Sequence, residues 1–302
     1  MPERIGTWRQ GAFARMASAL LLTGLWAVSA QAVTVQDDRQ KKIEVPRAPQ
    51  RIVSLLPSLT ETVCALGQCA KLVGVDRYSN WPASVAALPS LGGLEDTQVE
   101  ALVRLKPDLV LVARSSRVTS RLESLGLTVV ALEPQTMADV QRVTLSVALL
   151  LGLPDASERT ERLSQALRDG LQSLAQDVPV AARGARVYFE AGAGGYAAGE
   201  VSFIGEVLKS LGLKNVVPAS MGAFPKLNPE FVVRADPDII MLGETAGDSP
   251  LRRPAWAGLR AVRSQRVCAF EKTQVDVLVR SGPRMLEAAR SIVACLKKQG
   301  TP

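Results

Sequence analysis

Short apolar runs alternate with longer amphipathic stretches along most of this chain. Runs that are β-branched or leucine-rich at nearly every position predict strands buried on both faces. They fall into two groups, at residues 51–55, 72–75, 109–112 and 129–132, and then at 186–190, 239–242 and 266–270. Alternation of such strands with helices is typical of an α/β fold with parallel sheets.

Helical patterns occupy the stretches between these strands. The segment Ser58-Leu59-Thr60-Glu61 has the form of a capping box at the start of a helix. Short helices are predicted at 99–105, before Pro107, and at 203–211. The polar leading segment, 33–50, is assigned no element. The last helix has an apolar face made of Met285, Leu286, Ala289, Ile292, Val293 and Leu296.

One long helix is predicted in the middle of the chain, at 157–176. Its apolar stripe consists of Leu163, Leu167, Leu171 and Leu174. At ~1.5 Å per residue it would extend roughly 30 Å, which is enough to link two lobes. An ordinary surface helix would give the same local pattern.

The two groups of strands share an internal repeat. Glu100 is followed eight residues later by Asp108, and Glu230 is followed eight residues later by Asp238. Both copies have the pattern of a short helix with glutamate in its first turn, then Pro-Asp before a strand. The equal offset favours two related lobes.

The N-terminal segment, 1–32, has the order of parts found in a signal peptide. Three arginines precede an apolar run at 16–28 that ends in Ala30-Gln31-Ala32. The run is shorter than the ~20 residues that span a bilayer, so we predict cleavage after Ala32 and export to the periplasm. A buried N-terminal helix is the alternative. The remaining 302 − 32 = 270 residues are long for one domain, at ~150 residues per domain, and suffice for two lobes.

Composition excludes several classes of function. The net charge of +7 falls to 7 − 2 = +5 without the signal peptide, which carries three arginines and Glu3. Basic residues are scattered and aromatic residues make up 4%, so we expect no nucleic-acid partner. The chain has no histidine, the commonest general base and metal ligand. We therefore expect neither an enzyme nor a resident cofactor or metal ion.

Four cysteines in an exported chain indicate two disulfides. Cys64 and Cys69 are five residues apart, and Gly67 between them can end a helix and turn the chain back. Cys268 would then pair with Cys295 and join a strand to the last helix. Free buried thiols are the alternative.

Two further features lie in predicted loops. The segment 192–197 is glycine-rich and follows a strand, but the next helix starts near Ser202 and no acidic residue marks a ribose site. We expect a loop at the mouth of a cleft that presents Tyr196. Loop aromatics are candidates for ligand contact, although each suits a core as well: Tyr78, Trp81, Tyr196, Phe224 and Trp256.

Four segments, 51–61, 72–82, 105–110 and 280–284, carry a family resemblance. From residue 51 to 296 the chain resembles the helical-backbone class of periplasmic substrate-binding proteins of ABC importers, and most closely the cobalamin-binding members. The resemblance implies two Rossmann-like α/β lobes with parallel sheets. These would span 33–156 and 178–302, joined by one backbone helix at 157–177.

The resemblance also implies a function and its residues. A monomer would deliver a corrinoid (cobalamin) to an ABC permease and ATPase complex of the inner membrane. Glu100 and Glu230 match the acidic residues with which each lobe docks on permease arginines. Position adds Trp81 from a loop and two arginines, one after a predicted strand end and one at the start of the final helix, which could meet polar groups on the rim of the ligand. The candidate ligand-binding residues are then Tyr78, Trp81, Arg114, Tyr196, Phe224 and Arg280.

Departures from the cobalamin-binding pattern keep the ligand open. Gly92 and Ala113 stand where those relatives have tryptophans, and Gly93 stands near the iron-ligating tyrosine of haem-binding relatives. A corrinoid remains the first expectation. A haem or ferric-siderophore binding protein of the same class is the alternative, and a periplasmic nucleotide-binding enzyme is a more remote one.

Overall fold

The computed structural model describes Met1 and residues 32–299, apart from 193, 244–252 and 254. The predicted signal peptide thus lies outside the described residues, except for Met1 and Ala32. Among the helices that are described, none combines the length and apolar character needed to cross a membrane. All the elements below belong to the compact unit that begins at Gln31.

A four-stranded parallel sheet forms the first lobe, in the order β4-β3-β5-β6. Its strands are β3 (Ile52–Ser54), β4 (Leu72–Val75), β5 (Leu109–Val112) and β6 (Val129–Ala131). Apolar residues of α1 (Pro57–Ala65) and α4 (Met137–Leu150) cover one face, and those of α2 (Val99–Arg104) and α3 (Thr119–Ser124) cover the other. Both faces are buried, which explains the continuous apolar runs in the sequence.

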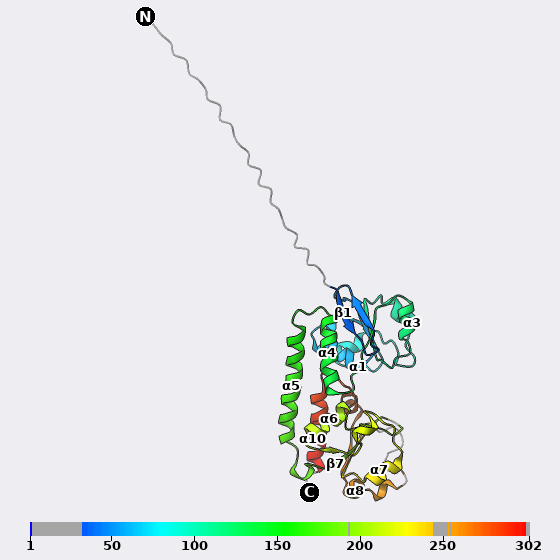
Figure 1. Ribbon diagram of the computed structural model, residues 1–302, viewed down its shortest axis with the longest axis vertical. Coiled ribbons are helices and arrows are strands. Elements are labelled where there is room, and N and C mark those ends of the chain that lie inside the picture. The colour runs from blue at the N-terminus through cyan, green and yellow to red at the C-terminus, as the bar shows by residue number, and fades with distance from the viewer. Residues whose placement is uncertain (2–31, 193, 244–252, 254, 300–302) are drawn as a thin grey trace. The chain divides into compact units, whose positions relative to one another are not determined.

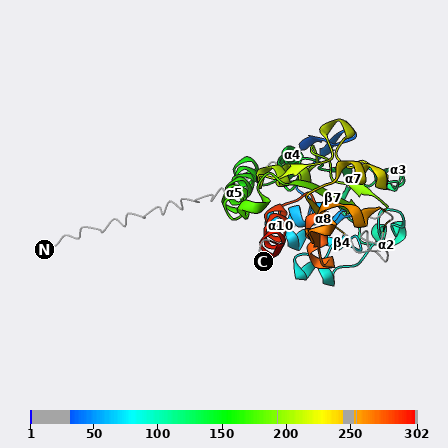
Figure 2. The same cartoon turned by 90° about the horizontal axis from the view of Figure 1, so that it is seen from below.

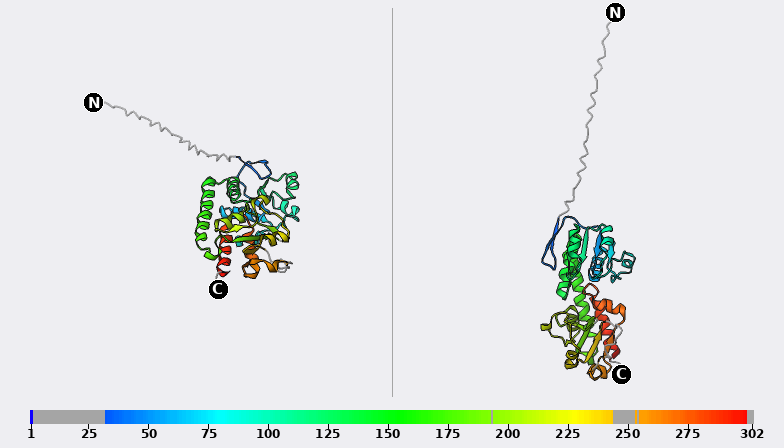
Figure 3. Two further views of the ribbon diagram at one scale, coloured as in Figure 1. Left: turned by 60° about the horizontal axis from the view of Figure 1, so that its bottom comes forward. Right: turned by 90° about the vertical axis from the view of Figure 1, so that its right-hand side faces the viewer.

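The second lobe has a five-stranded sheet in the order β11-β10-β7-β8, with β9 also pairing with β7. The strands are β7 (Arg186–Gly192), β8 (Tyr196–Ala197), β9 (Lys214–Asn215), β10 (Ile239–Leu242) and β11 (Val267–Ala269). Only β8 is antiparallel to its neighbour among these pairs. The helices are α6 (Phe203–Ser210), α7 (Pro229–Ala235), α8 (Arg260–Arg263), α9 (Lys272–Leu278) and α10 (Met285–Gln299). The predicted fold class, two α/β lobes with parallel sheets, is confirmed. The two lobes can be distinguished in the right-hand view of Figure 3.

The long helix α5 (Ala156–Gln176) runs alongside both lobes in Figure 1, and its apolar residues take part in a hydrophobic core of each lobe. Leu163 packs against the core of the first lobe, whereas Leu167, Leu171 and Leu174 belong to that of the second. Figure 2 shows α5 beside α10. The two helices approach closely at Gly170, where a Cβ atom would lie 2.5 Å from Leu286 Cδ2.

The internal repeat corresponds to the same local structure in each lobe. Asp108 Oδ2 accepts a hydrogen bond from Arg51 N at 3.0 Å, and Asp238 Oδ2 accepts one from Arg186 N at 2.9 Å. Each aspartate thereby fixes the start of the first strand of its own sheet. The residue six positions after each glutamate has a positive φ, 45° at Lys106 and 38° at Asp236.

The leading segment, 33–50, was expected to contain no helix or strand, and this expectation was wrong. β1 (Val33–Gln36) and β2 (Lys42–Val45) form an antiparallel hairpin. Val35, Ile43 and Val45 are buried and pack in the core of the first lobe. The alternation of polar and apolar residues in these two short strands was the signal to follow.

The predicted capping box at Ser58–Glu61 is also wrong. Helix α1 begins at Pro57, and the residue before it, Leu56, makes no side-chain cap. Glu61 is instead buried, with its carboxylate against arginines of the other lobe. Proline at the first position starts the helix because its missing N–H would have no partner there anyway.

Two disulfides are present in the described part of the chain. Cys64 is bonded to Cys69, and Cys268 in β11 is bonded to Cys295 in α10. Short 3-10 helices complete the structure at Cys69–Lys71, Ala83–Ala87, Val180–Ala182, Ala219–Met221 and Trp256–Gly258.

Candidate functional site

A cavity of about 630 Å³ is lined by residues of both lobes. Much of its wall comes directly after the carboxyl ends of parallel strands, where ligands of open α/β sheets bind. Leu56, Pro57 and Ser58 follow β3, and Tyr78 follows β4. From the second lobe come the end of β7, parts of α6 and α9, and the segment before α10.

Aromatic rings supply much of the apolar surface of this cavity. Tyr78 and Tyr196 are 55% and 46% exposed, so both can contact a ligand, although the charged groups of Arg77 and Lys226 lie 6.0 and 5.8 Å from their respective ring centroids. Phe224 packs against Phe203, with ring centroids 5.8 Å apart. Three of the predicted aromatic residues therefore meet here, together with Phe203, which the sequence analysis did not select.

The glycines at 92 and 93 shape the wall beside Tyr78. Gly92 has a φ of 87°, and a Cβ atom there would lie 2.4 Å from Asp96 O. A Cβ atom at Gly93 would lie 3.2 Å from Tyr78 Cε2. This backbone therefore leaves no room for a tryptophan at Gly92, and Gly93 lets the tyrosine ring lie against the main chain.

Arg280 lines the cavity, but its guanidinium is already occupied. Nη1 donates to Glu61 Oε1 at 2.8 Å and to Asn80 Oδ1 at 2.9 Å. Nη2 donates to Tyr78 O at 2.8 Å. Arg280 thus joins the second lobe to the first and holds the main chain of Tyr78 in place.

The carboxylate of Glu61 is buried at the centre of this contact between the lobes. Burial raises the pKa of Glu61, although Arg280 and Arg284 oppose that rise. Asn80 Nδ2 also donates to Asp276 Oδ2 at 2.8 Å, which adds a second link between the lobes.

Two predicted ligand residues lie outside this cavity. Trp81 is packed against the guanidinium of Arg284, whose Cζ lies 4.9 Å from the ring centroid. Arg114 lines a neighbouring polar cavity of about 420 Å³ instead. Trp256 is fully buried, with its ring 5.9 Å from that of Tyr188, and belongs to the core.

Sequence reasoning missed two charged residues of the cavity, Glu133 and Asp276. Glu133 lies two residues beyond β6, so the rule that ligands bind at strand ends would have pointed to it. Asp276 lies on α9, for which no helix was predicted.

The glycine-rich segment forms a strand pair and no phosphate loop. β7 continues to Gly192, which pairs with Tyr196 of β8. Helix α6 begins later, at Phe203, and is capped by the Ser202 side chain, which accepts a hydrogen bond from Gly205 N. The glycines therefore do not lie at a helix N-terminus, where a phosphate would bind.

Glu100 and Glu230 occupy equivalent positions, each the second residue of its helix. Both are exposed. Glu100 forms an ion pair with Arg121 at 2.8 Å. For Glu230, the described residues provide no ion pair.

Comparison with known proteins identifies the family. Residues 52–273 match the periplasmic binding protein family, and the chain belongs to it. It is therefore a binding protein and not an enzyme. Substrate-binding proteins of ABC importers work outside the cytoplasm with a permease and an ATPase, and they bind small ligands.

Individual relatives agree with this placement. An ABC transporter substrate-binding lipoprotein of Bacillus subtilis is 27% identical over 86% of this chain and 84% of its own length. A cobalamin-binding protein of Halobacterium salinarum is 33% identical over 71% of this chain, a match that spans 59% of that relative. The periplasmic vitamin B12 binding protein of Vibrio cholerae has a similar structure, with 25% identity and a TM-score of 0.66, covering 84% of this chain and 99% of that one.

Proposed function

We propose that this protein captures a corrinoid between its lobes and delivers it to an ABC permease of the inner membrane. The observation that carries the proposal is the group of aromatic rings, Tyr78, Tyr196, Phe203 and Phe224, in one cavity. Its volume of about 630 Å³ is within the range of small-molecule sites, roughly 300–1,000 Å³. Such rings suit the flat, largely apolar face of a macrocycle.

The charges around the cavity support a corrinoid over haem. The charged residues that line it are Glu133, Asp276 and Arg280, and Arg280 is already paired with Glu61. The propionates of haem or the charge of a ferric catecholate would face the carboxylates of Glu133 and Asp276 within this cavity, since Arg114, which is unpaired among the described residues, lines the neighbouring polar cavity instead. The periphery of a corrinoid carries uncharged carboxamides, which need only hydrogen bonds.

Binding of candidate ligands to the purified protein tests the proposal. We expect calorimetric titration to show binding of cyanocobalamin. Tyr78→Ala should weaken it by about tenfold, since an aromatic contact adds about 0.5–1.5 kcal/mol beyond the burial it provides. Leu125→Ala, an exposed apolar residue on the same lobe but outside the cavity, is the matched control and should leave affinity unchanged.

Haem or a ferric siderophore is the second candidate, and one observation favours haem. Tyr78 and Tyr196 both line the cavity, and tyrosine is a known axial ligand of haem iron. Binding of haemin or a ferric catecholate, without binding of cyanocobalamin at high micromolar concentration, would reject the corrinoid and keep the binding role.

Export is part of the same proposal. We propose that the chain reaches the periplasm by cleavage after Ala32, and that it acts there as a monomer without a resident cofactor. Mass spectrometry of the periplasmic form should show an N-terminus at Val33. An intact N-terminus in that fraction would instead indicate an uncleaved anchor.

A further inference from the structure

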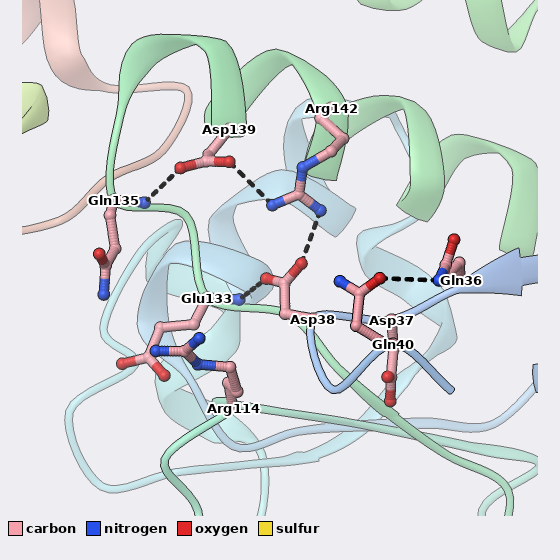
Figure 4. A pocket seen from close by; sticks show the side chains of 9 residues that line it. All are labelled: Gln36, Asp37, Asp38, Gln40, Arg114, Glu133, Gln135, Asp139 and Arg142. Atoms are coloured by element: carbon pink, nitrogen blue, oxygen red, sulfur yellow. Dashed lines mark hydrogen bonds and ion pairs between the residues drawn. The ribbon is translucent and has the colours of Figure 1, made fainter. Parts of the chain in front are cut away.

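A second cavity of about 420 Å³, here called the polar annex, is shown in Figure 4. It adjoins the cavity of about 630 Å³ that contains Tyr78, Tyr196, Phe203 and Phe224, here called the aromatic cavity. Glu133 and Gln135 line both, so the two spaces share a wall. Every side chain of the annex is polar. They are Gln36, Asp37, Asp38, Gln40, Arg114, Glu133, Gln135, Asp139 and Arg142.

Most of the acidic groups in the annex are occupied by the protein itself. Arg142 donates to Asp38 Oδ1 at 2.7 Å and to Asp139 Oδ1 at 3.0 Å, as Figure 4 shows. The other oxygen of Asp38 accepts from Glu133 N at 2.6 Å. Asp37 is paired with Arg39 at 2.6 Å. These contacts fix the β1–β2 hairpin over the end of β6.

Three side chains retain capacity for a ligand. Arg114 is exposed and has no hydrogen bond or ion pair with the described residues, so its guanidinium can donate. Glu133 Oε2 accepts from Ser115 N at 2.9 Å and Oε1 accepts from Ser115 Oγ at 3.2 Å, and each oxygen keeps a further lone pair for a ligand. The side-chain amide of Gln135 can both donate and accept.

We propose that the annex holds a carboxamide-bearing side arm of the ligand while the macrocycle lies against the aromatic rings. This inference rests on the proposed function, and it states that the annex selects a carboxamide over a carboxylate. A primary carboxamide has a carbonyl that accepts from Arg114 and an NH₂ that donates to Glu133. A carboxylate of the same size keeps the first contact but faces Glu133 with a like charge.

The charge balance of the annex gives the same selectivity. Among the residues that line the annex, four carboxylates, Asp37, Asp38, Glu133 and Asp139, stand against Arg114 and Arg142, so the balance is 2 − 4 = −2. Both Arg39 and Arg142 are already paired. An anionic arm is therefore disfavoured.

The test compares cyanocobalamin with its monocarboxylic acids, in each of which one peripheral carboxamide is hydrolysed to a carboxylate. We expect at least one isomer to bind about tenfold more weakly than cyanocobalamin, because two partly buried like charges repel. Glu133→Gln keeps an acceptor for Ser115 N and should reduce that difference severalfold. Arg114→Ala should weaken cyanocobalamin itself, whereas Arg117→Ala, outside the annex, should not.

The outcomes separate this inference from the function on which it rests. Equal affinity for cyanocobalamin and every monocarboxylic acid would refute the carboxamide site in the annex but leave the corrinoid assignment standing. The carboxamide site would also be refuted if Glu133→Gln left the difference in affinity between cyanocobalamin and the weaker acid unchanged. Absence of cyanocobalamin binding would refute the proposed function, and the annex assignment with it.

Discussion

Arg280 shows how far the role of a single residue depends on its partners. Sequence position alone suggested an arginine that meets the rim of a ligand. Its guanidinium instead contacts Glu61, Asn80 and the carbonyl of Tyr78, all in the other lobe. It therefore acts on the cavity by positioning Tyr78.

Loss of Arg280 should destabilise the protein because Glu61 would remain buried without its closest partner. We expect Arg280→Ala to lower the free energy of unfolding by about 3 kcal/mol, near the lower end for a broken buried pair, since Arg284 still lies 3.5 Å from Glu61. Urea denaturation measures the change. Removing both charges with Glu61→Leu and Arg280→Met should cost less than the single change, and a greater cost would contradict this account.

At the scale of elements, α4 begins with a true capping box. Thr136 caps the helix by accepting from Asp139 N, and the Asp139 carboxylate accepts from Thr136 N. Burial alone would raise the pKa of Asp139, but hydrogen bonds from Arg142, Gln135 N and Thr136 hold that pKa below its ordinary value.

The lowered pKa of Asp139 predicts a dependence of stability on pH. Because the pKa of the folded state is below that of the unfolded state, about 3.9, the ionised form stabilises the fold above that pH. The contribution disappears as pH falls through the folded pKa. Asp139→Asn should therefore cost about 1 kcal/mol at pH 7 and progressively less below pH 4, as followed by urea denaturation across pH. A constant difference down to pH 2 would contradict the assignment.

The disulfide between β11 and α10 closes a longer loop than the one beside α1. The separations are 27 and 5 residues. In the loop-entropy model these bonds contribute roughly 3.5 and 2 kcal/mol, so removing Cys268 and Cys295 should destabilise the protein more than removing the other pair. Thiol titration of the unfolded, unreduced protein should find no free thiol. Four reactive thiols would exclude both bonds.

At the scale of the whole molecule, the two lobes present matching glutamates. Glu100 and Glu230 occupy equivalent positions on α2 and α7, which agrees with the proposed docking of each lobe on permease arginines. Charge-assisted carboxylate–arginine contacts would fix the orientation of the complex.

Replacement of both glutamates by alanine should abolish transport and leave ligand affinity unchanged. Uptake in cells and titration of the purified variant measure the two effects. The matched control replaces two other exposed carboxylates, Glu95 and Glu158, and should transport normally. Loss of ligand binding in the Glu100/Glu230 variant would refute the docking assignment.

The amino-acid sequence by itself determined seven of the parallel strands (β3, β4, β5, β6, β7, β10 and β11), the long helix, the internal repeat and the family. Local periodicity gave the strands and the long helix, equal spacing gave the internal repeat, and four short segments gave the family. Among the elements that were missed, the hairpin has short strands, and the pattern of α4 merges with its apolar surroundings. Alternation of polar and apolar residues could have revealed the hairpin, and the Thr136–Asp139 capping box could have revealed the start of α4.

Only the tertiary structure decided which charges remain available to a ligand. Glu61 and Arg280 are 219 residues apart in sequence, and Asp38 and Arg142 are 104 apart, yet each pair is in contact. No local pattern encodes such contacts, because they depend on how separate elements pack. The same packing placed Arg114 in the annex, put Trp81 against Arg284 and brought Glu133 into both cavities.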